Sequence, residues 1–328
     1  MRTLLLDAVK TMMAELPRSD RLFVCGNPVM SHIFCGLSPE GLGRHPFRPL
    51  IKGTLTFTGV EAGLEDIGSV TVLPAASAFV GSDAVAGAKA AGVGDTGKTV
   101  LYIDFGTNGE EILIHKNRLF CTSSSAGPAF EGAEISCGTG GVPGAVNEVY
   151  VKDGRITFGA VDGINPSGIS GSGLCDLIAV LLDFGYIDRG GLMDRERFDL
   201  CKGVFLTRKD VRKFQLAQSA VRACTSILLE NAGITSSDVD EVILAGGLGT
   251  RIRPESALRT GILPKEFAGK IRRIGNSAIA GAAMCASPES GSLFLSSVEK
   301  TALDCISVDP GGNSRFQTFF LENMVFPE

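Results

Sequence analysis

The segment Asp104-Phe-Gly-Thr-Asn-Gly109 places a carboxylate and a glycine-rich turn between two runs of strand-forming residues. Gly106 and Gly109 can adopt backbone angles that are closed to other residues, which lets the main chain turn its N–H groups toward one anion. Thr107 and Asn108 add short side chains that can donate hydrogen bonds to the same anion. Phosphate suits such a turn, and we therefore predict that Gly106, Thr107, Asn108 and Gly109 bind the phosphates of a nucleotide.

Asp104 ends a strand that is expected to be buried, where an ionised carboxylate is costly unless it meets a cation. A Mg²⁺ ion bound through water, which also bridges to phosphates, would provide that cation. We predict Asp104 as a catalytic residue and as the metal-binding residue. The alternative is an ordinary β-hairpin in which Asn108 and Gly109 only form the turn.

A second group of glycines follows the apolar strand at 241–245, namely Gly246, Gly247 and Gly249. A main chain without side chains would let an adenosine lie flat against it, so these glycines are the predicted nucleoside site. Glycines that only allow close helix packing are the alternative. The sequence contains neither a G-x-x-x-x-G-K-[ST] motif nor a complete dinucleotide-binding G-x-G-x-x-G motif.

Two segments rich in small residues, 75–88 and 276–284, are predicted to form helices that cross closely and can act as a hinge. Asp83 is the one acid among the small apolar residues of the first segment. It either faces a cleft, where it could orient water, or faces solvent. We include Asp83 as the second catalytic candidate.

Alternating strand and helix patterns predict an α/β protein with a central sheet covered by helices. The same order of elements occurs twice in the sequence. Two strands are predicted at 22–25 and 70–73, and a small-residue helix follows the second. Two more are predicted at 241–245 and 271–274, and such a helix again follows the second. A repeat with a separation of roughly 200 residues predicts a duplicated domain. Only the later half has a hairpin, at 101–123, ahead of these strands. We therefore predict that residues 1–97 are the C-terminal remainder of a first half truncated at its N-terminus, and that 98–328 form the second half.

Local signals predict several further helices. Apolar residues recur at helical spacing before Pro17, Ser170 begins a helix that Gly185 ends, and Thr207 with Asp210 begins one that ends near Gly233. In the loop regions, 125–133 is expected to lead into a helix, and 286–315 is polar and remains unassigned.

Composition narrows the class of partner. The 328 residues carry a net charge of −5 without a block of Lys or Arg, which argues against nucleic acid or an anionic membrane as the principal partner. Asp176 and Asp183 interrupt the longest apolar run, so no membrane span is expected. Nine scattered cysteines without a C-x-x-C pair favour buried thiols in a reducing cytoplasm over a metal or cluster site.

Six motifs occur in an order that resembles a known family: IDFGTNGEE, SSAGPAFEGAEI, GISGSGLCDLI, FQLAQSAVRA, VILAGGLGTRI and IGNSAIAGA. They are similar to the C-terminal ATPase region of the reductive activators of corrinoid proteins, in the acetate and sugar kinase/Hsp70/actin superfamily. The resemblance covers almost the whole chain. It implies an actin-like, ribonuclease H-like duplicated ATPase fold.

The same resemblance implies a function. Members of this family hydrolyse ATP and deliver a low-potential electron to an inactive Co(II) corrinoid, which restores Co(I) in a methyltransferase system. The implied cofactors are ATP and Mg²⁺, and the implied partner is a corrinoid protein or its methyltransferase. Carried over to this chain, Asp104 holds Mg²⁺, Gly106 to Gly109 hold the phosphates, and Gly246 and Gly247 hold the nucleoside.

The chain departs from the family pattern in two ways, since it lacks the N-terminal iron–sulfur domain and the first phosphate motif. We therefore expect no iron–sulfur cluster in this chain and a separate iron–sulfur electron donor. Three explanations of these absences stay open: the chain is a fragment, a partner completes the site, or the chain is a degenerate relative. Whether the chain forms a homodimer and whether it hydrolyses ATP alone also stay open. The alternatives are a non-catalytic relative that binds a corrinoid or methyltransferase partner, and a small-molecule kinase of the same superfamily.

Overall fold

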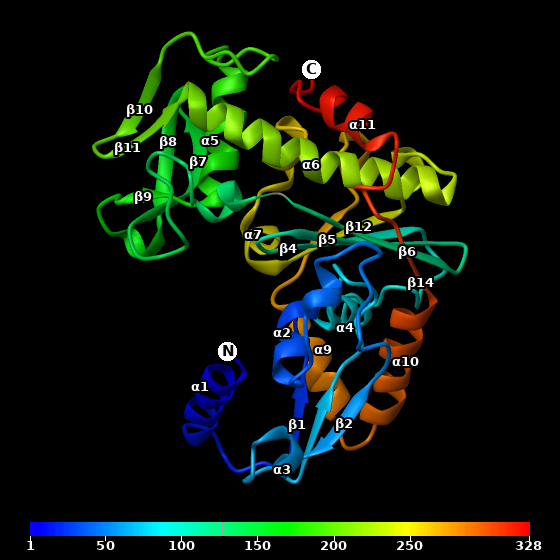
Figure 1. Ribbon diagram of the computed structural model, residues 1–328. Coiled ribbons are helices and arrows are strands. Elements are labelled where there is room, and N and C mark those ends of the chain that lie inside the picture. Colours follow the sequence, from blue (N-terminus) through cyan, green and yellow to red (C-terminus); the bar gives the residue numbers. More distant parts are fainter. Residues whose placement is uncertain (126) are drawn as a thin grey trace. The chain divides into compact units, whose positions relative to one another are not determined.

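The computed structural model describes residues 1–125 and 127–328 and divides into two compact units. Unit 1 comprises Met1–Tyr102, Glu110–Thr122 and Asn276–Val308 (Figure 1). Unit 2 comprises Ile103–Gly109, Ser123–Gly275 and Asp309–Glu328. Both units combine helices and strands, which confirms the predicted α/β class.

Unit 1 contains a three-stranded sheet of order β1-β3-β2, in which β1 is parallel and β2 antiparallel to β3. Its strands and β14 are short: β1 (Arg21–Val24), β2 (Leu55–Thr58), β3 (Ser69–Val72) and β14 (Cys305–Ser307). The helices of unit 1 are α1 (Arg2–Ala14), α2 (Pro28–Phe34), α3 (Gly59–Ala62), α4 (Ser82–Ala90), α9 (Ser277–Ala286) and α10 (Gly291–Asp304). Asn27 caps α2, because its Oδ1 accepts from the backbone N–H of Met30 at 2.9 Å.

The two small-residue helices of unit 1, α4 and α9, pack against each other, which confirms the predicted close crossing. A Cβ atom built on Gly281 would lie 2.4 Å from the carbonyl oxygen of Ala86. One built on Gly87 would lie 2.7 Å from Ser277 Oγ, which also hydrogen-bonds the hydroxyl of Tyr102 at 2.9 Å. Glycines are therefore required where the two helix backbones meet.

The predicted helix over 75–88 is wrong in its first half, because α4 begins only at Ser82. The Ser77 hydroxyl accepts hydrogen bonds from the backbone N–H groups of Phe79 and Val80 at 3.1 and 3.0 Å. Such a local side-chain cap offers the backbone an alternative to the helix. Residues 75–81 are accordingly a turn.

Unit 2 contains a three-stranded sheet of order β8-β7-β9, the hairpin β10-β11 and the parallel pair β12-β13. The bounds of these strands are β7 (Ala145–Lys152), β8 (Arg155–Ala160), β9 (Gly168–Ile169), β10 (Arg197–Cys201), β11 (Val204–Thr207), β12 (Glu241–Ala245) and β13 (Ile271–Arg273). Its helices are α5 (Gly171–Asp183), α6 (Arg208–Ala232), α7 (Gly246–Arg251), α8 (Pro254–Arg259) and α11 (Phe316–Glu322). The strand pairs that the sequence repeat relates, β1 with β3 and β12 with β13, are both parallel.

The largest sheet has the strand order β13-β12-β4-β5-β6-β14. Its central strands are β4 (Val100–Phe105), β5 (Gly109–His115) and β6 (Arg118–Ser124). These strands form the predicted hairpin region at 101–123. The whole predicted phosphate turn, from Gly106 to Gly109, belongs to unit 2.

The helix caps predicted for unit 2 are confirmed. Thr207 and Asp210 form a capping box at the start of α6, and Gly233 ends that helix in the left-handed conformation with φ 73°. Ser170 caps α5. The helix expected after 125–133 is wrong, because the described residues of this segment contain only the 3₁₀ turn η2 (Pro128–Glu131), and Ala126 lies outside the described residues. None of the helices in 1–125 and 127–328 is long and apolar enough to cross a membrane.

Candidate functional site

A polar pocket of about 490 Å³ lies within unit 2. It is formed by the end of β4, the turn η2, the loop after it, the start of α5 and the helix α7. The residues that line it are Phe105, Gly106, Phe130, Glu131, Thr139, Gly140, Gly141, Ser170, Gly171, Ser172, Gly247, Leu248 and Arg251.

The predicted phosphate turn reaches this pocket through Gly106. Gly106, Thr107 and Asn108 are exposed, and the Gly106 N–H donates to the Asn108 carbonyl oxygen at 2.9 Å. Neither Gly106 nor Gly109 has a positive φ, so the predicted reason for these two glycines is wrong. Gly109 is buried, and a Cβ on it would lie 2.6 Å from Ser124 Oγ. Packing against β6 therefore explains Gly109.

Thr107 is tied to the pocket wall by a hydrogen bond. Its hydroxyl donates to Glu131 Oε1 at 2.6 Å, and Glu131 is a carboxylate that lines the pocket. The preceding residue, Phe130, is buried and packs edge-on against Phe214 with ring centroids 5.6 Å apart. The aromatic contact anchors η2, so that Glu131 stands beside the turn after β4.

Asp104 lies against the start of α7. A Cβ atom on Gly246 would lie 2.3 Å from Asp104 Oδ1 and 2.4 Å from the Phe105 carbonyl oxygen. Gly246 also has φ 78°, which disfavours any side chain. Glycine at this position is therefore required by the close approach of the half-buried Asp104.

The other two predicted nucleoside residues have different surroundings. Gly247 is exposed, lines the pocket and has no atom within 4 Å of the position of a Cβ. Gly249 is buried, and its Cβ would lie 3.3 Å from the backbone of Leu244 and 3.5 Å from the Phe105 ring. Gly247 therefore keeps the pocket open, whereas Gly249 serves the packing of α7.

The wall formed by the start of α5 was not predicted from the sequence. Ser170 Oγ donates to the Val146 carbonyl oxygen at 3.2 Å, and Ser172 Oγ donates to that of Asn147 at 2.8 Å. A Cβ on Gly171 would lie 2.0 Å from the Phe130 carbonyl oxygen. The Ser-Gly-Ser-Gly run at 170–173 is the sequence feature that could have indicated a binding site here, but it was interpreted only as the start of a helix. Thr139, Gly140 and Gly141 had not been selected at all.

The lining suits an anionic ligand with a flat apolar part. Thr139, Ser170, Ser172 and Arg251 line a space bordered by glycines, and Arg251 is a positively charged residue. The amino end of α5, a helix of 13 residues, adds backbone N–H groups and the positive end of the helix dipole. The volume falls in the range of ordinary small-molecule sites. These residues fit a nucleotide.

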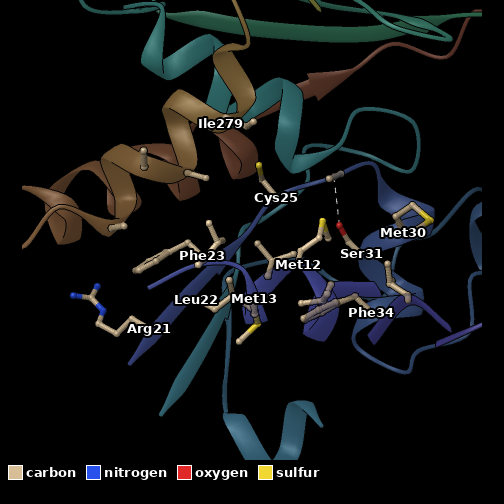
Figure 2. Close-up of a pocket in the computed structure, with 18 residues that line it drawn as sticks. Met12, Met13, Arg21, Leu22, Phe23, Cys25, Met30, Ser31, Phe34 and Ile279 are labelled. Carbon is tan, nitrogen blue, oxygen red and sulfur yellow. Dashed lines mark hydrogen bonds between the residues drawn. The ribbon is translucent and has the colours of Figure 1, made fainter. Parts of the chain in front are cut away.

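A second cavity, in unit 1, is larger at about 650 Å³ but has a different chemistry. Figure 2 shows that β1 and residues of α9 border it, with apolar and sulfur-containing side chains around it. Its thiol, Cys25, is unreactive at neutral pH, because burial and the nearby Asp83 raise the pKa of Cys25 to about 11. Polar groups that could recognise phosphate are scarce there, so size alone does not identify the nucleotide site.

Asp83 belongs to unit 1, whereas every residue that lines the polar pocket belongs to unit 2. The Asp83 carboxylate is half-buried and accepts a hydrogen bond from the backbone N–H of Ala84 at 2.9 Å. Burial raises the pKa of Asp83 above its usual range, and this hydrogen bond opposes the shift. A catalytic role for Asp83 stays a prediction.

Comparison with protein-family models identifies the chain. Residues 98–328 match the model described as the C-terminal domain of RACo, the ASKHA domain, and residues 2–96 match the RACo middle region. The chain belongs to the RACo family. The suspected relationship to reductive activators and the actin-like ATPase fold class are thereby confirmed, and the ASKHA fold implies nucleotide binding.

Proteins similar to the chain include two curated proteins and a solved structure. The corrinoid activation enzyme RamQ of Eubacterium limosum is 34% identical, over 79% of this chain and 48% of its own length. The [Co(II) methylated amine-specific corrinoid protein] reductase of Methanosarcina barkeri is 27% identical, over 81% of this chain and 55% of its own length. A structure of a reductive activator for corrinoid, iron-sulfur protein matches with a TM-score of 0.85 and 27% identity, over 97% of this chain and 54% of that chain. The chain thus spans about half the length of the relatives that it matches.

Proposed function

We propose that this chain is the ATP-binding module of a reductive activator that restores Co(I) in a corrinoid protein of a methyltransferase system. The observation that carries the proposal is the polar pocket of unit 2, in a chain whose 98–328 region matches the ASKHA domain of RACo. The names of both curated relatives support the corrinoid partner. A separate iron–sulfur protein is the proposed source of the electron that converts Co(II) to Co(I).

Within the pocket, the proposed roles follow the chemistry of the lining. Backbone N–H groups at the amino end of α5 bind phosphate oxygens beside the turn at Gly106, while Gly247 leaves room for the nucleoside. Arg251 neutralises part of the phosphate charge. Thr107 keeps the turn after β4 attached to Glu131.

Asp104 is the proposed residue for Mg²⁺, because it is a carboxylate at the end of β4 next to the glycines of α7. Among residues 1–125 and 127–328, no group of three or more His, Cys, Asp or Glu side chains could hold a metal ion. The proposed ion is therefore one that binds a single protein carboxylate, water and phosphate, as Mg²⁺ commonly does. When bound, it would neutralise phosphate charge.

Calorimetric titration of Mg·ATP into the chain and its Gly247→Val variant tests the nucleotide site. Valine at this exposed position meets no atom within 4 Å of its Cβ, so the fold should tolerate it, while its methyl groups fill the pocket. We expect saturable binding to the unmodified chain and a loss of at least about tenfold in affinity in the variant.

Gly275→Val is the matched control, because Gly275 is also exposed, also has no atom within 4 Å of its Cβ and lies outside the pocket. It should bind Mg·ATP like the unmodified chain. No heat from the unmodified chain at millimolar Mg·ATP would refute the proposal and favour a non-catalytic relative that binds a corrinoid or methyltransferase partner.

The corrinoid assignment has its own test, the visible spectrum of a Co(II) corrinoid protein mixed with a reduced iron–sulfur donor. Conversion to Co(I) should require both this chain and Mg·ATP. Conversion at the same rate without the chain, or with Gly247→Val, would contradict the assignment.

A further inference from the structure

The two walls of the polar pocket are joined by an ion pair between a buried carboxylate and a partly exposed guanidinium. Asp176, on α5, is 1% exposed, and its Oδ1 accepts from Arg253 Nε at 2.9 Å. Arg253 follows α7 by two residues and is the N-cap residue of α8. The pair therefore connects the helix that begins at the pocket with the segment that leaves it.

Both members of the pair also bind β7. Asp176 Oδ2 accepts from the Val149 backbone N–H at 3.1 Å, and Arg253 Nη2 donates to the Val149 carbonyl oxygen at 2.5 Å. Ser256 Oγ adds a further hydrogen bond to Asp176 Oδ1 at 2.6 Å. The carboxylate thus has a partner on each oxygen, and the guanidinium uses its fork geometry to reach both Asp176 and β7.

The same strand holds the start of α5 at the pocket. The hydroxyls of Ser170 and Ser172 donate to the carbonyl oxygens of Val146 and Asn147, which precede Val149 on β7. Hydrogen bonds therefore link Arg253, which follows α7 in the chain, through Asp176 and β7 to the residues that line the pocket on the side of α5.

We infer that Asp176 and Arg253 are positioning residues that fix the nucleoside wall of the pocket, α7, relative to its phosphate wall at the start of α5. This inference rests on the proposed nucleotide site. Neither side chain lines the pocket, so both act through the elements that they hold. A ligand that contacts both walls gains affinity only when their separation is already correct.

Arg253→Lys is the principal test, because lysine keeps the charge but lacks the fork that binds Asp176 and Val149 together. We expect the variant to fold and to bind Mg·ATP about tenfold more weakly, the loss that corresponds to one charge-assisted hydrogen bond. Asp176→Asn is the second variant. Its amide group would face the Val149 N–H or Arg253, so we expect a larger loss of affinity.

A second ion pair, between α5 and α8, provides the matched control. Arg259 Nε, on α8, donates to Asp183 Oδ1, on α5, at 2.6 Å, and neither residue lines the pocket. Asp183 is the last residue of α5, so this pair lies at the other end of the helix from the pocket. Arg259→Lys and Asp183→Asn should change the affinity for Mg·ATP by less than about twofold.

Hydrogen exchange in the ligand-free protein gives a readout that does not require nucleotide binding. Arg253→Lys should accelerate exchange in residues 170–173 and 246–251, whereas Arg259→Lys should not. The inference is overturned if exchange in these segments is unchanged, or if both ion pairs affect it equally. An unmodified chain that binds no Mg·ATP but shows the selective change in exchange would instead refute the proposed function alone.

Discussion

Asp83 is a charged residue whose surroundings oppose its charge. Because burial raises the pKa of Asp83 in the folded protein, the folded chain binds more protons than the unfolded chain between the unfolded and folded pKa values. The contribution of the Asp83 carboxyl to the stability of the fold is therefore lost as the pH rises from the unfolded-state pKa through the folded-state pKa.

This direction of the pH dependence leads to a prediction for the stability of Asp83→Asn, a substitution that removes the charge of the side chain but keeps its shape. The variant should have a higher urea midpoint than the unmodified chain at pH 7, and the gain should shrink as the pH falls through the raised pKa of the Asp83 carboxyl. Asp153→Asn, at an exposed turn between β7 and β8, is the control and should leave the midpoint unchanged. A lower midpoint for Asp83→Asn at pH 7 would show that the charge is stabilising.

The individual glycines show how far a sequence can predict a site. Their spacing led to the correct edge of unit 2, where Gly106 and Gly247 line the pocket. It could not separate them from Gly109 and Gly249, because a glycine that opens a pocket and one that allows close packing have the same sequence. The distinction depends on tertiary contacts, here with Ser124 and Leu244.

At the scale of elements, helix ends that are capped by nearby side chains could be predicted from the sequence. Helices whose position depends on tertiary contacts could not. The capping box of α6 and the Ser170 cap of α5 depend on residues a few positions apart. By contrast, α10 falls in a polar stretch that gave no periodic signal, although Val298 and Ala302 pack it into unit 1. Likewise, the late start of α4 depends on the Ser77 hydroxyl.

The packing of α4 against α9 leads to a stability prediction for Gly281→Ala. The new methyl group would lie 2.4 Å from the Ala86 carbonyl oxygen, so the two helices must move apart. Overpacking of this kind costs about 1–3 kcal/mol, which urea unfolding can measure. The control Gly275→Ala, at an open exposed position, should stay within about 0.5 kcal/mol of the unmodified chain. Equal stabilities for Gly281→Ala and the control would contradict the close crossing.

At the scale of the whole molecule, the last residues belong to the core of unit 2. Phe326 is fully buried beside Phe214, and its backbone N–H donates to the Arg189 carbonyl oxygen at 2.9 Å. Gln215 and Gln218, on α6, donate to the carbonyl oxygens of Met324 and Asn323. No pattern in the sequence had indicated that this terminal segment is buried.

Phe326→Ala should therefore destabilise the chain by about 3–5 kcal/mol, the usual cost of removing a buried aromatic ring. Val325 is 48% exposed, so Val325→Ala should cost less than about 1 kcal/mol. Urea unfolding of the two variants checks the difference. Similar losses for both would mean that the terminal segment is not held as the structure shows.

The predicted boundary between residues 97 and 98 also belongs to this scale and stays a prediction. The sequence repeat related pairs of strands within each half of the chain, whereas the compact units include segments far apart in sequence, such as Asn276–Val308 in unit 1. Sequence order alone does not show which segments share a core, because that depends on contacts across long loops.

The central claim is that the polar pocket of unit 2 binds a nucleotide, and a crystal structure of the chain with Mg²⁺ and a non-hydrolysable ATP analogue tests it most directly. The account predicts phosphate density beside Gly106 and the start of α5, nucleoside density against Gly247, and a metal ion bound to Asp104 through water. A pocket that stays empty at saturating analogue, or an analogue bound elsewhere in the molecule, would contradict it.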